Sequence, residues 1–292
     1  MAETLQTLRR RVRSIANTQQ VTRAMEMVSA AKLRRTQAAL MAARPYVRHL
    51  EALLGRLAPI ARASGHPLFA EREVNRATLV LLTADRGLCG SFNSNLFRQA
   101  HKHLDARDGV VVDLICIGRR GADYFARAGY AVTARYDGFG GKLDRAKSDQ
   151  IAQILFDRFA AAETDEVHIL YSDFISTAVT RPTLEKFLPI DQSILERLAA
   201  ETGAPLDYLF DPDRETVVRG LAPNYLRSKI FICLAESFTS EHSARMLAMN
   251  NATKNCDELV DALTLRLNKA RQSTITGELL DIVGGAEALT KG

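Results

Sequence analysis

The loop at residues 84–93 is the first place in this sequence where side chains and spacing could support chemistry. It follows a short apolar run and precedes a helix-like run, which is where nucleotide-binding folds hold phosphate groups. The loop reads ADRGLCGSFN, and it has neither the G-x-G-x-x-G spacing nor the Gly-Lys-Ser/Thr of a phosphate loop. We therefore favour a tight strand-to-helix turn, with Ser91 or Asn93 as the helix cap.

A second loop in a similar setting is GRRG at residues 118–121, directly after the apolar run of residues 110–117. Two arginines between glycines could bind an anion. Short turns at strand ends commonly have the same composition, because glycine adopts backbone angles that other residues avoid. A turn is therefore the favoured interpretation here as well, and an anion site is the alternative.

Other residues that could act as acids, bases, nucleophiles or metal ligands are scattered. Histidines stand at positions 49, 66, 101, 103, 168 and 242, and cysteines at 89, 116, 233 and 256. No two cysteines have the spacing of a zinc or redox motif, and His101 and His103 face different sides of a predicted helix. Asp85 is a candidate acid without an identifiable partner. We expect no catalytic residue, no cofactor and no metal.

The two loops belong to a central segment in which short apolar runs alternate with helix-like ones. Strands are predicted at residues 78–83, 110–117, 131–135, 166–171 and 183–189, and helices at 93–104, 120–127 and 147–162. This alternation is typical of an α/β domain around a largely parallel sheet. We assign residues 77–205 to this domain and expect it to be Rossmann-like.

The first segment, residues 1–58, predicts a long helix, because it has no glycine before position 55 and its first proline is Pro45. Residues at heptad spacing are apolar near both ends of this helix, and residues at the same spacing in its middle part are polar. There, Val21, Met25 and Val28 are expected to carry the apolar stripe on a shifted face. We expect Pro45 to kink the helix and Pro59 to close it, near residue 58.

The last segment, residues 210–289, predicts a second long helix with no proline after Pro223. About 60 helical residues would extend roughly 90 Å. Together the segments predict a long antiparallel coiled coil of N- and C-terminal helices, with the α/β domain inserted between them. If Pro45 and Pro223 lie side by side, residues 268–289 have no partner helix, although this stretch is rich in apolar side chains.

The charge is concentrated at the start of the chain, where residues 1–48 contain ten Lys and Arg but only Glu3 and Glu26 as acids. Such a segment implies an acidic partner, which could be nucleic acid, lipid or protein. The arginines at 9, 10, 11 and 13 point all round a helix, and the first 45 residues contain no aromatic side chain to stack on bases. Two alternatives stay open, a nucleotide-dependent α/β enzyme with a coiled-coil appendage and a basic coiled-coil nucleic-acid binder.

Four segments carry a resemblance to a known family. They are NTQQVTRAMEMVSAAKL at 17–33, DRGLCGSFNSN at 85–95, EHSARMLAM with NATKN at 241–255, and NKARQSTIT with GAEAL at 268–289. They resemble, in order and over nearly the whole chain, the ATP synthase gamma subunits, the central stalk of F-type rotary ATPases. The resemblance implies the rotor shaft of a proton-translocating ATP synthase, a non-catalytic subunit that couples rotation of the membrane ring to ATP synthesis and hydrolysis in the beta subunits.

The same resemblance implies partners and contact residues. The partners would be the alpha and beta subunits of a hexamer, the epsilon subunit and the c-ring of the membrane sector, with no nucleic acid. Met25, Arg245, Gln272 and Thr276 fall where the shaft would meet loops of the beta subunits. The apolar end of the second helix would be the bearing tip, formed by Ile275, Leu279, Ile282 and Val283.

Two further expectations concern location and the role of Arg245. No apolar run approaches the length of a membrane span, and no transit peptide precedes the first motif, so a peripheral position on the cytoplasmic face of a bacterial inner membrane is favoured. Arg245 could pair with a carboxylate of a beta-subunit loop. The alternative is a pair within the helix itself, because Glu241 stands one turn earlier.

Overall fold

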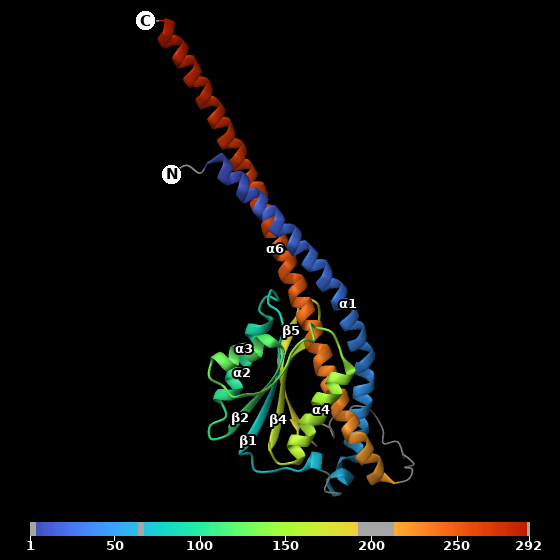
Figure 1. Cartoon of the computed structure of the whole chain (residues 1–292). Helices are drawn as coiled ribbons and strands as arrows, with labels where there is room; N and C mark the ends of the chain where they lie inside the picture. Colours follow the sequence, from blue (N-terminus) through green and yellow to red (C-terminus); the bar gives the residue numbers. More distant parts are fainter. Residues whose placement is uncertain (1–3, 64–66, 192–212, 291–292) are drawn as a thin grey trace. The chain divides into compact units, whose positions relative to one another are not determined.

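A computed structural model describes residues 4–63, 67–191 and 213–290. Along the sequence, an α/β region lies between two long helices (Figure 1). The helices are α1 (Leu5–Ala63), α2 (Phe92–Asp105), α3 (Arg119–Arg127), α4 (Arg145–Ala160) and α6 (Arg214–Thr290), with the short 3-10 helix η1 (Pro67–Phe69). The strands are β1 (Arg76–Leu82), β2 (Val111–Ile117), β3 (Val132–Tyr136), β4 (Glu166–Phe174) and β5 (Thr180–Leu188). The predicted α/β class, with long helices at both ends of the chain, is confirmed.

The five strands form one sheet in the order β3-β2-β1-β4-β5. The first four are parallel, and β5 returns antiparallel to β4. Six of the seven residues of β1 are buried, as expected for a parallel strand covered on both faces. Alternate residues of β1 pack into two different apolar cores. Val80 and Leu82 pack in a core with residues of α1, α4 and α6, whereas Leu79 and Leu81 pack in a core with residues of α2 and α3.

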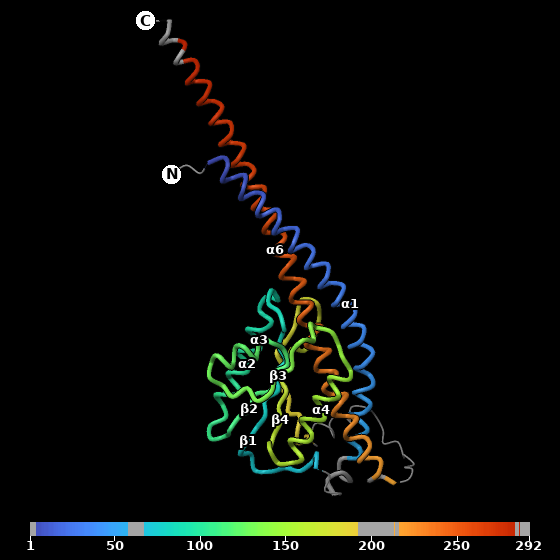
Figure 2. Tube along the Cα trace, in the orientation of Figure 1, coloured from blue at the N-terminus to red at the C-terminus, as the bar shows by residue number. Residues whose placement is uncertain are grey.

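The chain divides into two compact units. One consists of residues 29–245 and contains the whole sheet, and the other consists of residues 1–28 and 246–292. In the larger unit α1 and α6 run antiparallel, with Arg44 bound to Glu236. They are also antiparallel in the smaller unit, where Thr253 Oγ1 donates to Thr22 Oγ1 at 2.8 Å and Asn250 Nδ2 to Glu26 Oε1 at 2.9 Å (Figure 2).

Prolines do not end the long helices where we expected. Helix α1 continues through Pro45 and Pro59 to Ala63, past the predicted end near residue 58. Helix α6 begins at Arg214 and includes Pro223. A proline inside a helix removes one backbone hydrogen bond, but burial of a neighbouring apolar face can outweigh this cost. Leu54 and Leu57 in α1 are fully buried, and so is Ala222 in α6.

The expected apolar stripe on a shifted face of α1 is wrong. Val21 and Val28 are 58% and 57% exposed, whereas the polar heptad residues Thr22 and Ser29 are buried. The heptad therefore continues in its original register. Buried hydroxyls are tolerated where they have partners, and Thr22 Oγ1 donates to Gln19 O and accepts from Thr253 Oγ1.

The predicted register of the helix pair also needs correction. In the smaller unit, Gln19 contacts Asp257. Leu5 stands 14 residues before Gln19, so the same register places it opposite about residue 271, whereas Pro45 beside Pro223 would place it opposite about residue 263. The domain limits of residues 77–205 and 210–289 fall partly within residues 192–212, outside the described part of the chain, and stay predictions.

Candidate functional site

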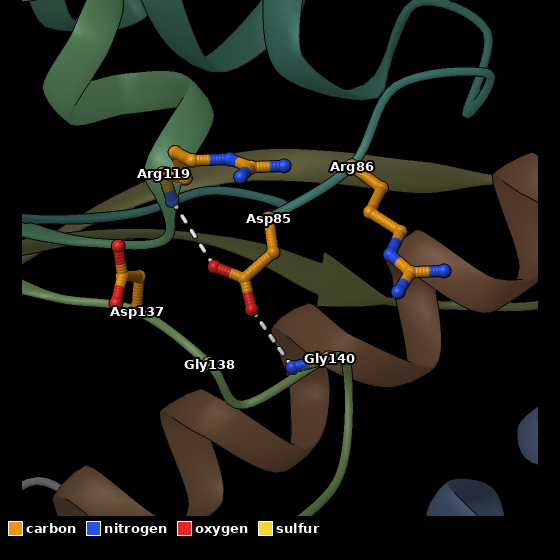
Figure 3. A pocket seen from close by; sticks show the side chains of 6 residues that line it. All are labelled: Asp85, Arg86, Arg119, Asp137, Gly138 and Gly140. Carbon is orange, nitrogen blue, oxygen red and sulfur yellow. Dashed lines mark hydrogen bonds between the residues drawn. The ribbon is translucent and has the colours of Figure 1, made fainter.

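The loop after β1 is closed by a carboxylate of the chain itself. Asp85 Oδ1 accepts a hydrogen bond from the backbone N–H of Arg119, the first residue of α3, at 3.1 Å, and Oδ2 accepts from Gly140 N at 2.8 Å (Figure 3). Amides at a helix N-terminus favour anions. Asp85 therefore places a carboxylate of the chain itself at the N-terminus of α3. The candidate acid found in the sequence has two backbone partners that the sequence could not identify.

The segment of residues 118–121 is the tightly packed start of α3, with Gly118 at the N-cap position. Gly118 has a φ of 107°, and a Cβ atom there would lie 2.1 Å from Thr83 O. Gly121 N donates to Thr83 Oγ1 at 3.0 Å. Thr83, directly after β1, thus fills the space in front of both glycines, and the expected turn is replaced by the N-cap and first residues of α3.

The start of α2 matches the sequence-based expectation in position but not in detail. Ser91 occupies the N-cap position, but its side chain makes no capping hydrogen bond. Asn93 instead folds the loop back, because its Oδ1 accepts from Ala84 N at 3.0 Å. Leu88, in the same loop, has a φ of 62° and is 62% exposed. The loop thus holds an apolar side chain outward on a left-handed backbone.

The pocket at this edge of the sheet has a volume of about 310 Å³. Its lining consists of Asp85, Arg86, Arg119, Asp137, Gly138 and Gly140 (Figure 3). Two acids and two arginines balance in charge, so the lining does not create the positive field that binds phosphates. Among the described residues, no group of three or more His, Cys, Asp or Glu side chains could hold a metal.

The structure brings together a polar cluster that sequence reasoning missed. Glu166 Oε2 accepts from Arg107 Nη1 at 2.7 Å, and Glu166 Oε1 lies 3.0 Å from Lys186 Nζ. Burial opposes ionisation of Glu166, but these hydrogen bonds outweigh it and lower its pKa. The rings of His103 and His168 lie 4.9 Å apart beside it, and burial lowers the pKa of His168 to about 4. These residues come from four separate elements or loops, and their spacing in the sequence gave no signal.

Arg245 is buried and bonded within the larger unit. Its Nη1 donates to Glu241 Oε1 at 2.7 Å, and Nη2 and Nε donate to Arg86 O at 3.2 Å and Gly87 O at 3.4 Å. Burial raises the pKa of Glu241, and the charge of Arg245 opposes this shift. The pair within the helix, which the sequence offered as the alternative, is therefore present.

Comparison with known proteins identifies the family. A family model described as ATP synthase matches residues 4–289. The chain is 43% identical over 282 residues to an ATP synthase gamma chain of Desulforamulus reducens, covering 97% of this chain and 98% of the relative. It is 42% identical to that of Pelotomaculum thermopropionicum over 285 residues, covering 98% and 99%.

The chain belongs to the ATP synthase gamma chain family. As a member, it is a non-catalytic subunit and the central rotor shaft of its complex. Solved structures agree in fold. A chain of the Euglena gracilis mitochondrial ATP synthase (OSCP/F1/c-ring, rotational state 3) superposes with a TM-score of 0.68 at 19% identity, covering 99% of this chain and 95% of that chain. One from the Tetrahymena thermophila central stalk and c-ring gives a TM-score of 0.60 at 22% identity, covering 80% and 99%.

Family membership replaces both alternatives left open by the sequence, the nucleotide-dependent enzyme and the nucleic-acid binder. It also directs attention to the far end of α6. There the predicted tip residues Ile275, Leu279, Ile282 and Val283 are 49% to 67% exposed. No helix in the described part of the chain is long and apolar enough to cross a membrane.

The remaining residues expected at the beta-subunit loops differ in exposure. Gln272 and Thr276 are exposed, and Thr276 Oγ1 donates to Gln272 O at 2.9 Å, one turn earlier in α6. Met25 is half-buried. The contact role of Met25, Arg245, Gln272 and Thr276 stays a prediction.

Proposed function

We propose that this shaft turns inside a hexamer of alternating alpha and beta subunits, and that the α/β region contacts the epsilon subunit and the c-ring. In this arrangement, rotation of a proton-driven ring would be coupled to ATP synthesis and hydrolysis in the beta subunits. The complex would lie on the cytoplasmic face of a bacterial inner membrane, with this chain as a peripheral component. Relatives named ATP synthase gamma chain support the assignment.

The observation that carries this proposal is the exposed apolar end of α6. Ile275, Leu279, Leu280, Ile282 and Val283 are large apolar side chains, each about half exposed or more. Apolar patches on a lone helix favour aggregation in water unless another protein covers them. A ring of apolar side chains at the top of the hexamer would cover these residues on every side.

Helix α1 offers a second exposed surface in the smaller unit. Val21, Met27 and Val28 are 57% to 63% exposed. Arg9 and Arg10 are also exposed, near the start of α1. This combination of cations and apolar side chains fits acidic and apolar loops of surrounding subunits.

Hydrogen exchange on the isolated chain and on the assembled complex tests the proposal. We expect fast exchange across residues 272–289 in the isolated chain, because a single helix without tertiary packing frays. Assembly should protect these amides strongly. Equal protection in both states would mean that the tip is packed within this chain, and the proposal would fail.

The coupling role of Arg245 needs a variant that keeps the buried charges balanced. Removing Arg245 alone would leave Glu241 buried without its cation, and any loss of function could then come from misfolding. We therefore compare Glu241→Gln with the double variant Arg245→Gln and Glu241→Gln. If Arg245 contacts a beta loop, the double variant pumps fewer protons per ATP than Glu241→Gln. Equal pumping per ATP would refute a coupling role for Arg245.

A further inference from the structure

Residues 236–245 of α6 read ESFTSEHSAR, yet all of them except Ala244 are buried. Every residue from position 233 to 243 is buried, including Ser240 and Ser243 at 0% and His242 at 1% exposure. Burying polar groups is costly unless each has a hydrogen-bond partner. The partners of this stretch lie largely outside α6, in the α/β region of the same unit.

One face of the stretch binds the hairpin of β4 and β5. Ser240 Oγ donates to Ser172 O at 3.0 Å and Ser243 Oγ donates to Thr177 O at 2.5 Å. Glu236 Oε2 accepts from the backbone N–H of Phe174 at 3.0 Å. The three α6 positions are spaced by four and three residues, so they lie on one side of the helix.

Helix α1 joins the same contact through Arg44. Its Nε and Nη2 donate to the two carboxylate oxygens of Glu236 at 2.9 and 3.0 Å, and Nη2 also donates to Phe174 O at 2.9 Å. Arg44 thereby binds α6 and the end of β4 at once. Both long helices are thus tied to the hairpin by directional bonds.

The next residues of α6 bind two further loops. His242 Nε2 lies 2.8 Å from Gly141 O, in the loop between β3 and α4. A Cβ atom on Gly141 would lie 2.4 Å from the His242 ring, so only glycine allows this approach. Arg245 donates to Arg86 O and Gly87 O in the loop between β1 and α2. Three separate segments of the α/β region are therefore bound to about three turns of α6.

We propose that Glu236, Ser240, His242, Ser243 and Arg245, here called the polar collar, fix the α/β region to the helix pair so that torque passes between them. Apolar contacts are non-directional and permit sliding, whereas hydrogen bonds hold a defined geometry. All the bonds from the collar to the α/β region go to backbone atoms, so they hold the loops themselves. The inference rests on the proposed function and assigns a task to Glu236, Ser240, His242 and Ser243, which are not among the predicted coupling contacts.

The chain offers a matched pair of variants. Ser240→Ala with Ser243→Ala removes two hydroxyls that reach the hairpin. Thr239→Val is the control, because Thr239 is also 0% exposed but its hydroxyl donates to Ala235 O in its own helix. Arg245 is left unchanged, since it is also a predicted coupling contact.

The decisive measurement uses the assembled complex with the hexamer fixed and the tip of α6 clamped in it. A probe on the α/β region then reports the angular spread of its thermal motion. We expect a broader spread, that is a lower torsional stiffness, in the double serine variant, and the wild-type spread in Thr239→Val. An unchanged spread in the double variant would overturn the collar proposal. If the wild-type chain neither assembles nor rotates in the hexamer, the rotor proposal itself fails.

Hydrogen exchange on the full isolated chain keeps the collar testable should the double variant assemble poorly. The amides of Ile175, Ser176 and Val179, which bond only within the turn of the hairpin, should exchange faster in the double serine variant. The amides of β1 should stay as protected as in the wild type. Unchanged exchange at the hairpin, or equal acceleration throughout the sheet, would contradict a local fastening by the collar.

Discussion

Helix α6 contains two stretches in which the usual distribution of side chains is reversed. Around residues 236–243 polar side chains are buried, and around residues 275–283 apolar side chains are exposed. In the first stretch the polar groups find their partners in the same chain. For the second stretch, we infer that another protein covers the apolar groups. A departure from the rule of apolar inside and polar outside therefore identifies contacts, and the partner can be in the same chain or in another.

The largest effect should come from closing the space between Gly141 and His242. Gly141→Ala places a methyl group against the imidazole ring, at a residue with a φ of 69°. We expect a loss of about 3 kcal/mol in the free energy of unfolding, from overpacking together with a left-handed backbone. Denaturant unfolding of the isolated chain measures it.

Gly138→Ala is the matched control for this change. Gly138 also has a positive φ, 79°, but a Cβ atom there would meet nothing within 4 Å. Its loss should be about 1 kcal/mol, the backbone cost alone. Similar losses in both variants would mean that the packing of His242 against Gly141 contributes little to the first stretch.

Acid should weaken the buried polar stretch through His242. Burial lowers the pKa of His242 to about 4, its bond to Gly141 O opposes this shift, and the charges of Arg245 and Lys32 add to it. In the unfolded chain the imidazole binds a proton near pH 6.5, whereas in the native chain it stays neutral until the pH nears 4. The stability that the neutral buried imidazole allows is therefore fully present above pH 6.5, and the free energy of unfolding decreases as the pH falls toward 4. The loss amounts to ~3 kcal/mol for a shift of this size.

His242→Phe separates this contribution from those of other groups. Phenylalanine retains a ring but cannot titrate. The stability difference between wild type and His242→Phe should therefore shrink as the pH falls from 6.5 to 4, measured by denaturant unfolding at each pH. A constant difference across this range would show that His242 is not the group that titrates.

The sequence predicted most elements of the α/β region, because strands such as β1 and β2 are short, largely apolar runs. Predicted residues 110–117 became β2 (Val111–Ile117), and 120–127 became α3 (Arg119–Arg127). Family motifs identified the shaft, since they occur at both ends of the chain. These features are local, so pattern and spacing were sufficient to find them.

Contacts between distant segments could not be predicted in this way. Val21 and Val28 were expected at the helix seam because they are apolar, but Thr22 and Ser29 take it. Thr22 has a hydrogen bond across the helix pair, and its partner is the distant residue Thr253. Likewise, the cluster around Glu166 gathers Arg107, His168 and Lys186, and nothing in their separate neighbourhoods indicated it. The two amide donors to Asp85 come from the start of α3 and from the loop between β3 and α4, which are distant from Asp85 in the sequence.

The smallest effect on stability should come from the exposed apolar stretch. Leu279→Ser with Ile282→Ser alters side chains that are 57% and 67% exposed. In the isolated chain the free energy of unfolding should change by no more than about 0.5 kcal/mol, as for most surface substitutions. The fully buried Leu54 provides the contrast, because Leu54→Ser removes a packed side chain and should cost several-fold more.

In the assembled complex, Leu279→Ser with Ile282→Ser should have a larger effect on stability than in the isolated chain. If a partner covers Leu279 and Ile282, the same double variant loses apolar burial there, and the complex dissociates at a lower denaturant concentration than the wild type. The comparison of isolated and assembled chains thus separates an external from an internal role. A tip variant that destabilises the isolated chain as strongly as Leu54→Ser would place its partner within this chain. The exposed apolar stretch would then have its contact partner in this chain, as the buried polar stretch does.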